Sequence, residues 1–568
     1  MDRRVFLAVI LAALVFIVTP ILFPNSAPVS RVDSLRGDSS HATAGKAATL
    51  TGAKETQDSS HETQVPPAIL TPVSPAASSG DSSSVATPHM TMWYSGMGGA
   101  PLRAELTSYT SRSPRSEGKP VVIATTKGTP LLQYRLLLGD TVLDLARAPL
   151  AVQQSSGADE RTVEYQGSVG NHTVSLRYTG ATTEAGRYLV HVSVDVSPVS
   201  GAGSLVLELP STLVSAESDT ADDIRHLAYG YKPKGGSVES LPFAKLDSGV
   251  VKQVAGADEW VAVRDKYFLV AVMTPDSSLG PLTFTGAPRV AKLAPEAMAT
   301  ATLPLRDGKA AFDLYVGPQE FERLRALGHD LDRVNPYAGW LHAVVQPFAT
   351  LVTKVLLWMK SASGLGYGWV IIIFGVSIRL LLWPLNQSAM RTSIRMQRLQ
   401  PELAEVQKRY KNDPDKQRDA LVKLYQAHGM TPFSPMMGCL PMLLPMPILF
   451  ALYFVFLNTI EFRGVSFLWL RDISAADPYY ILPLLMGLSM FVLSWIGMRG
   501  MPPNPQTKMM SYMMPVVLTF MFFRFAAGLN LYYAVQNVAA LPQQWLLARE
   551  RAGIAKGDGA TKDRRDKT

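Results

Sequence analysis

The sequence contains a single cysteine, Cys439, among 568 residues. One thiol cannot form an intramolecular disulfide, so any domain outside the cytoplasm must be held together by packing alone. The chain also lacks the Gly-x-x-x-x-Gly-Lys-Ser/Thr phosphate loop, the Gly-x-Ser-x-Gly of serine hydrolases and the His-Glu-x-x-His of zinc proteases. We therefore expect a protein that is not an enzyme and that uses no cofactor and no metal. A membrane enzyme such as an intramembrane protease remains the weakest alternative.

Charged residues make up only 18% of the chain, while the formal net charge is +8 and the pI is near 9.3. A basic balance can indicate a nucleic-acid partner. Here, however, Lys and Arg cluster beside apolar segments, as the positive-inside rule places them in membrane proteins. We therefore expect these charges to face a phospholipid bilayer, and we expect no sequence-specific binding of nucleic acid.

The N-terminus combines two arginines with a long apolar run. Arg3 and Arg4 precede residues 5–23, whose length approaches the roughly 20 residues that cross a bilayer. Residues 1–24 are therefore predicted to be a transmembrane anchor, with a cleaved signal peptide as the alternative. Residues 25–91 are rich in Ser, Thr, Ala, Pro and Gly and cannot bury a core, so they are predicted to be a flexible periplasmic tether.

Residues 92–330 contain short runs of alternating apolar and polar residues, separated by Gly, Pro, Asn and Asp. This pattern predicts a periplasmic β-sandwich. Its expected strands include residues 121–124, 131–138, 173–178, 188–196, 205–209 and 267–273. A helix is expected at residues 318–327. Residues 331–362 are predicted to form an interfacial amphipathic helix, because apolar residues recur there every three or four positions.

Five more apolar segments follow, each about long enough to cross a bilayer. They are residues 368–385, 436–457, 479–498, 508–525 and 529–547. With the anchor they predict a polytopic α-helical membrane protein of six transmembrane helices, with the second helix in residues 363–385 and the third to sixth in residues 432–548. Six crossings place both termini in the cytoplasm. The basic loop 386–431 and the basic tail 549–568 agree with this topology.

One cation lies inside an apolar predicted helix: Arg379, two residues after Ser377. A guanidinium at this depth costs roughly 2.5–3.5 kcal/mol on insertion scales unless it snorkels, pairs or meets water. Snorkelling or pairing with a carboxylate is the plainer interpretation, but the later apolar segments hold no Asp or Glu. The last segment instead carries polar residues whose spacing predicts one helix face, and these are Tyr533, Gln536, Asn537 and Gln544. A polar stripe facing Arg379 predicts a water-filled substrate groove.

The third predicted span is rich in Met and Pro. Met side chains are flexible and polarizable, so Met442 and Met446 suit a groove wall that accepts many apolar sequences. Filling of an ordinary helix interface is the alternative role for these residues. The prolines weaken helical hydrogen bonding and favour an irregular segment that lines a cavity.

The loop before this span is predicted to form a cytoplasmic hairpin of two helices, with a turn at residues 412–414. Its basic residues are candidates for docking and include Arg391, Arg395, Arg398, Lys408 and Arg409. They either form a solvated face that holds anionic lipid or dock ribosomes and targeting partners.

Taken together, these segments resemble the YidC/Oxa/Alb family of membrane insertases in its Gram-negative YidC form. The resemblance rests on residues 378–385, 399–401, 438–441, 446–453 and 528–537. It implies that the sandwich is a periplasmic β-supersandwich and that a five-helix insertase core holds a groove open to cytoplasm and lipid. It also implies that Arg379 attracts acidic residues of a translocating tail and that Tyr533 contacts the passing apolar segment.

The function implied by this resemblance is that of a membrane protein insertase and chaperone in the bacterial inner membrane. The implied partners are nascent membrane proteins, together with the Sec translocon and the ribosome. A small-solute transporter or channel is the alternative, because it would use an intramembrane charge in a similar way.

Overall fold

The computed structural model describes residues 82–199, 201–274, 278–288, 295–335, 342–384, 386–387, 399–410, 413–428, 446–499 and 505–565. The predicted anchor therefore lies outside the described residues, as do four candidate site residues: Met442, Arg391, Arg395 and Arg398. Residues Ala76–Thr568 cluster into one compact unit.

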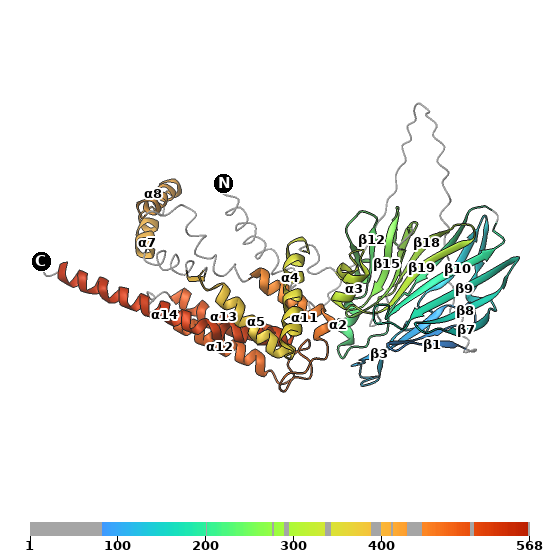
Figure 1. Cartoon of the computed structure of the whole chain (residues 1–568). Helices are drawn as coiled ribbons and strands as arrows, with labels where there is room; N and C mark the ends of the chain where they lie inside the picture. The colour runs from blue at the N-terminus through green and yellow to red at the C-terminus, as the bar shows by residue number, and fades with distance from the viewer. Residues whose placement is uncertain are drawn as a thin grey trace, which may run out of the picture. The chain divides into compact units, whose positions relative to one another are not determined.

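Three antiparallel sheets form the first described part of the chain, the β-sandwich (Figure 1). A nine-stranded sheet has the order β13-β12-β15-β16-β19-β10-β9-β8-β7, a six-stranded sheet the order β14-β17-β18-β11-β5-β6, and a four-stranded sheet the order β1-β2-β3-β4. The strands are β1 (Ser83–Ala86), β2 (Met90–Tyr94), β3 (Pro101–Thr110), β4 (Pro120–Ile123), β5 (Gln133–Leu138), β6 (Thr141–Asp144), β7 (Ala151–Ser156), β8 (Glu160–Val169), β9 (His172–Ala181), β10 (Leu189–Ser197), β11 (Gly203–Leu209), β12 (Ala228–Pro233), β13 (Glu239–Pro242), β14 (Val251–Val254), β15 (Asp258–Arg264), β16 (Phe268–Met273), β17 (Leu282–Gly286), β18 (Ala297–Leu305) and β19 (Lys309–Pro318).

Alternating side chains place one face of most strands in a common core. In β10, every second residue from Val190 to Val196 is buried, and Val192 lies opposite Tyr178 of β9 and Phe312 of β19. All six residues of β16 are buried, so this strand is covered on both faces. Residues of all three sheets share one apolar cluster, which holds the domain together without a disulfide.

The six predicted strands are confirmed, since each coincides with an observed strand to within three residues at each end. The sandwich begins earlier than expected, however, because β1 and the start of β2 lie inside the segment predicted as tether. β1 consists of Ser83, Ser84, Val85 and Ala86 and pairs with β2 along its whole length. Its small and polar side chains give no apolar alternation, so sequence pattern alone could not identify it.

Helices form the second described part. They are α4 (His342–Ser363), α5 (Tyr367–Leu381), α7 (Gln400–Arg409), α8 (Pro414–Ala427), α11 (Met446–Asn458), α12 (Ile481–Gly497), α13 (Pro505–Phe522) and α14 (Ala527–Arg565), while the short α2 (Thr220–Arg225) and α3 (Phe321–Leu327) accompany the sandwich. A helix is found in each of the five apolar segments. α14 continues far beyond the expected end at residue 547, because Ala, Arg, Glu and Lys favour a helix even where apolar residues are absent.

The helices pack around their own apolar cluster, which α4, α5, α11, α12, α13 and α14 share. α4 packs on α11, and α14 lies between α5 and α12. Among the described helices, none is by itself both long and apolar enough to meet the usual test for a membrane span. Residues Val345–Ser363 and Tyr367–Leu381 pass the test only as a pair, with a bend of 117° between them.

Candidate functional site

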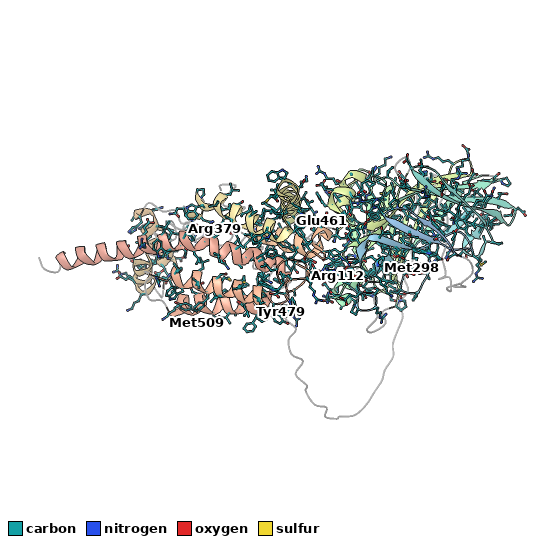
Figure 2. All side chains as sticks on the ribbon, turned by 60° about the horizontal axis from the view of Figure 1, so that its bottom comes forward. Arg112, Met298, Arg379, Glu461, Tyr479 and Met509 are labelled. Carbon is teal, nitrogen blue, oxygen red and sulfur yellow. The ribbon has the colours of Figure 1, made fainter. Side chains whose placement is uncertain are left out.

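Arg379 lies in the last turn of α5 and is half-buried against α14 (Figure 2). Its Nη2 donates a hydrogen bond to Oε1 of Gln543 at 2.8 Å. Gln543 is fully buried and donates in turn to the Trp383 carbonyl at 3.3 Å and to Oε1 of Gln387 at 3.2 Å. The arginine is therefore held by a chain of neutral groups between two packed helices.

Within the described part of the chain, no carboxylate lies within ion-pair distance of Arg379, and its Nε is buried without a hydrogen-bond partner. A neutral amide orients a guanidinium but does not neutralise it. The site therefore keeps a net positive charge and an unused donor. It can attract a carboxylate, which would both pair with the charge and accept the free N–H.

The polar residues of α14 fall on two faces, not on the single face that we expected. Gln536 donates to the Gly375 carbonyl of α5 at 2.7 Å, on the same side as Gln543. Asn537 donates instead to Ser489 Oγ of α12 at 3.1 Å. Gln544 follows Asn537 by seven residues and lies against Gly497 of α12. Adjacent positions on a helix point about 100° apart, which explains why Gln536 and Asn537 contact different neighbours.

Tyr533 takes part in none of these hydrogen bonds to α5 and α12. Its ring packs edge-on against Phe522 of α13, with centroids 5.5 Å apart, and against Tyr532 at 5.5 Å. No contact joins Tyr533 to Arg379 in the described residues. Ser377 is exposed on α5, and Met446 is half-buried at the start of α11. The structure therefore brings together Arg379, Gln536 and Gln543, but not the whole set that the sequence suggested.

Large apolar side chains also cover the outside of the helical part. Trp369 and Leu381 of α5 are 52% and 73% exposed, and Leu488 of α12 and Phe520 of α13 are 60% and 66% exposed. α13 adds four exposed methionines, which are Met509, Met510, Met513 and Met514. Figure 2 labels the first of them, Met509. Apolar patches of this kind mark a surface that contacts lipid or another protein.

The two helices of the predicted hairpin are present, as α7 and α8, and they contact each other. Each begins with proline in its first turn, and Asp413 caps α8 by accepting from the Lys416 N–H at 3.1 Å. Lys408 and Arg409 are exposed in the last turn of α7. Within the described part of the chain, neither forms an ion pair.

Sequence reasoning missed the residue that holds Arg379. Gln543 is one of several polar residues in α14, and only the packing of α14 on α5 distinguishes it. A weak signal existed, because Gln536 and Gln543 are seven residues apart and so share a face. Among the described residues, no group of three or more His, Cys, Asp or Glu side chains could hold a metal ion.

Two family models match the chain. Residues 82–351 match the model described as the YidC periplasmic domain, and residues 358–553 match the 60Kd inner membrane protein. These ranges correspond to the β-sandwich, extended into α4, and to the helical part.

Curated relatives named "Membrane protein insertase YidC" are also similar. The relative from Burkholderia multivorans is 32% identical over 56% of each chain, and that from Geobacter metallireducens is 36% identical over 53% of this chain and 55% of its own. The chain thus spans about half the length of these relatives. The relative from Anaeromyxobacter dehalogenans is 30% identical over 72% of each chain. Since this last match includes both parts of the molecule, the chain belongs to the YidC family.

Proposed function

We propose that this protein is a membrane protein insertase, as its relatives are named, and that it also acts as a chaperone in the bacterial inner membrane. In this proposal the chain crosses the membrane six times with both termini in the cytoplasm, α4 lies at the outer interface, and the β-sandwich is periplasmic. The exposed apolar side chains of α5, α12 and α13 would face lipid. A helix that is apolar on all sides is expected in a membrane, where no water penalises its outer face.

The observation that carries the proposal is the state of Arg379. It is a half-buried cation that is bonded to an amide, has a free N–H and has no carboxylate partner in the described residues. An unpaired charge away from water is costly, so such a cation gains free energy when it binds a carboxylate. We therefore assign Arg379 to the transient binding of a carboxylate in the translocating tail of a client protein.

The groove around Arg379 would shorten the distance that a polar tail must travel through hydrocarbon. At 4 Å, a carboxylate and a guanidinium attract each other by about 4 kcal/mol at an effective dielectric constant of 20, compared with about 1 kcal/mol in water. The apolar segment of the client would then pass Tyr533 and the wall expected from Met442 and Met446 into lipid. Transfer of apolar area into lipid favours this step, and no nucleotide would be consumed.

We assign the remaining polar residues supporting roles. Ser377 and Gln536 of the Arg379 side would keep the groove hydrated, whereas Asn537 and Gln544 would hold α14 against α12. Lys408 and Arg409 of α7, with Arg391, Arg395 and Arg398, would contact the ribosome or anionic lipid. The Sec translocon is a further proposed partner for clients with large translocated domains.

The test is reconstitution of the purified full-length chain into liposomes, followed by synthesis of a single-span client with an acidic N-terminal tail. Arg379→Gln should lower the insertion rate about tenfold, which corresponds to about 1.4 kcal/mol. The matched control is Arg549→Gln, since Arg549 is exposed and stacks on Trp545 on the same helix that holds Gln543. A client whose tail acids are replaced by Asn should be insensitive to Arg379→Gln. Equal losses for both clients would refute the carboxylate step.

A small-solute transporter would behave differently in the same liposomes. It would release or take up a charged solute when no client is present, and Arg379→Gln would change that flux. Client insertion without solute flux supports the insertase.

A further inference from the structure

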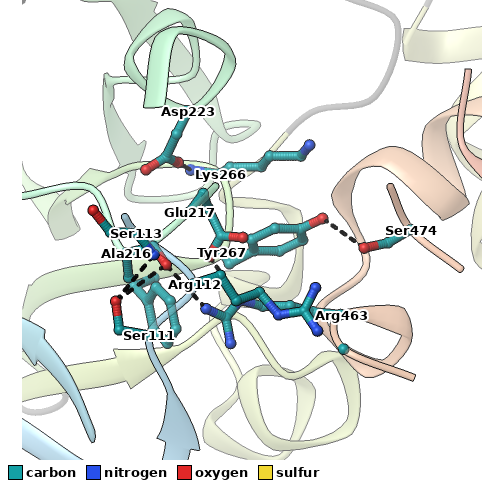
Figure 3. A network of polar contacts seen from close by, with 12 residues as sticks. Ser111, Arg112, Ser113, Ala216, Glu217, Asp223, Lys266, Tyr267, Arg463 and Ser474 are labelled. Carbon is teal, nitrogen blue, oxygen red and sulfur yellow. Dashed lines mark hydrogen bonds and ion pairs between the residues drawn. The ribbon is translucent and has the colours of Figure 1, made fainter. Parts of the chain in front are cut away.

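The β-sandwich is fastened to the segment that connects α11 and α12, residues 459–480, which we call the connecting segment. Arg463 Nε donates to Glu217 Oε1 at 2.6 Å, and its Nη2 donates to the Ala216 carbonyl at 3.3 Å. In the other direction, Arg112 of the sandwich forms an ion pair with Asp472. Figure 3 shows the Tyr267 hydroxyl directed at Ser474, to which it donates at 3.5 Å. The chain thus contains a polar junction between residues far apart in sequence.

One carboxylate in this junction has no cation. Glu461 Oε1 accepts a hydrogen bond from the backbone N–H of Phe321, the first residue of α3, at 2.9 Å. The other oxygen, Oε2, is buried and has no hydrogen-bond partner in the described residues. Unlike Glu217 and Asp472, Glu461 is therefore only half satisfied.

A small cavity lies beside Glu461 and is lined by both parts of the junction. Its walls are Gln319, Phe321, Leu324, Asp332, Val334, Asn335, Asn458, Thr459 and Glu461. Asn458 and Thr459 are 8% and 3% exposed, and their oxygens Oδ1 and Oγ1 also lack partners among the described atoms. Asn458 Oδ1 can only accept a hydrogen bond, so it needs a donor. An ionised Glu461 has no proton to donate, whereas a protonated one has.

The charged groups around Glu461 also oppose its ionisation. Burial raises its pKa from the ordinary value of 4.5 to about 7, and the charges of Glu320 and Glu322 on the α3 side contribute to this increase. Asp332 lines the same cavity, and the charge of Glu461 adds to the burial and the Glu320 charge that raise the pKa of the nearby Tyr109. Two of the nearby cations are already engaged, because Arg187 and Arg323 both bind Glu320, whereas Arg325 of α3 is exposed to solvent.

We propose that Glu461 is a proton-controlled latch that fastens the β-sandwich to the connecting segment. When protonated, its carboxyl accepts from Phe321 and donates into the cavity, where Asn458 and Thr459 lack partners. When ionised, it places an unpaired negative charge among Glu320, Glu322 and Asp332, and the junction loosens. The ion pairs of Arg463 and Arg112 hold the same surfaces at every pH near neutrality, so the latch adjusts an attachment that already exists.

The direction of the pH effect follows from linkage. The pKa of Glu461 is higher in the closed junction than in an open one, where it returns to about 4.5. The closed state is therefore favoured fully below pH 4.5, and this advantage is lost as the pH rises through about 7. Between pH 6 and pH 8 the closing equilibrium should fall roughly tenfold.

Hydrogen exchange of the full-length protein in lipid nanodiscs tests the latch. After correction for intrinsic exchange rates, peptides covering α3 and the connecting segment should lose protection roughly tenfold from pH 6 to pH 8. Glu461→Gln has both an acceptor and a permanent donor, so its protection should be the same at both pH values and should match that of the unaltered protein at pH 6. Glu322→Gln, a change at an exposed acid of α3, is the matched control and should keep most of the pH dependence.

A second variant distinguishes the titration of Glu461 from a general loss of stability at the junction. Arg463→Gln should lower protection at both pH values but leave the ratio between them unchanged, because it removes an ion pair and not the titrating group. The proposal is overturned if the unaltered protein shows no pH dependence in these peptides, or if Glu461→Gln retains that dependence. It is also overturned if Glu461→Gln loses protection at pH 6 while the core strand β16 stays protected.

Discussion

Arg379 of the helical part differs from two buried cations of the β-sandwich in the kind of group that binds it. In the β-sandwich, Arg135 pairs with Glu208 at 3.1 Å, and Lys232 pairs with Glu259 at 3.1 Å. Among the described residues, Arg379 hydrogen-bonds to the side-chain amide of Gln543 and forms no ion pair. A carboxylate cancels the charge of a cation, whereas an amide leaves it in place. Arg379 therefore retains an electrostatic attraction that Arg135 and Lys232 have already satisfied.

The two parts also differ in where their large aromatic side chains lie. In the sandwich the large aromatic side chains point inward, and Trp260, Tyr134 and Phe284 are fully buried. On the helices many point outward, as Trp495 does at 47% exposure. The sandwich uses apolar area to stabilise itself in water, whereas the helices present apolar area to their surroundings. Loss of a large aromatic side chain should therefore destabilise the sandwich strongly and the helical part little.

The strongest test of this difference compares two tryptophans. Trp260 is fully buried in β15 and donates from Nε1 to the His329 carbonyl at 2.8 Å. Trp260→Ala should lower the free energy of unfolding by about 3–5 kcal/mol, because it leaves a large cavity. Trp495→Ala should leave it nearly unchanged in detergent. Urea titration of the full-length protein, followed by circular dichroism of the β-sheet signal, measures both. Equal losses would contradict the comparison.

Breaking a buried ion pair of the junction is expected to have the next largest effect. The side chain of Arg463 is 3% exposed and that of Glu217 is 11% exposed. Arg463→Gln should cost about 3 kcal/mol, because Glu217 remains buried without its cation. Adding Glu217→Gln should restore part of this loss, and a double-mutant cycle quantifies the coupling. The control is Lys309→Gln, since the pair of Lys309 with Asp195 is exposed and spans 3.5 Å. Its effect should be below about 1 kcal/mol.

Local patterns predicted most elements of both parts. Alternation identified β9 and β10, and continuous apolar composition identified α12 and α13. The misses have physical causes. β1 has too few apolar residues to show an alternating pattern. The end of α14 is helical because its residues have a high intrinsic helix propensity. Hydrophobic periodicity therefore could not detect either element.

Contacts between distant residues could not be predicted from local pattern. Arg463 and Glu217 are 246 residues apart, and nothing near either residue in the sequence indicates the other. Arg379 was recognised because a charge within an apolar run stands out, but its partner Gln543 was not. Two neighbouring polar residues, Gln536 and Asn537, were assigned to one face although a helix turns by about 100° between them.

A smaller effect should follow from removing the amide that holds Arg379. Gln543→Leu leaves the arginine and the Gln387 amide without a partner, so the helical part should lose about 1–3 kcal/mol. Gln544→Leu, one residue later and directed at α12, is the control. Insertion of an acidic-tailed client should slow with Gln543→Leu and respond little to Gln544→Leu. If the two variants behave alike in that assay, Gln543 does not position the arginine.

The smallest effect on stability, but a measurable one on binding, is expected for the exposed charges of α7. Lys408→Gln and Arg409→Gln remove no buried contact, so the midpoint of unfolding should not change. Each charge near an anionic surface contributes to binding, and the affinity of the full-length protein in neutral nanodiscs for ribosomes should fall about fivefold per charge at low salt. Raising the ionic strength should remove the difference, because exposed charges are screened beyond a Debye length of about 8 Å at physiological salt. A loss of affinity that persists at high salt would mean that these side chains make specific contacts. The charges of α7 would then resemble the paired cations of the sandwich more than the unpaired Arg379 of α5.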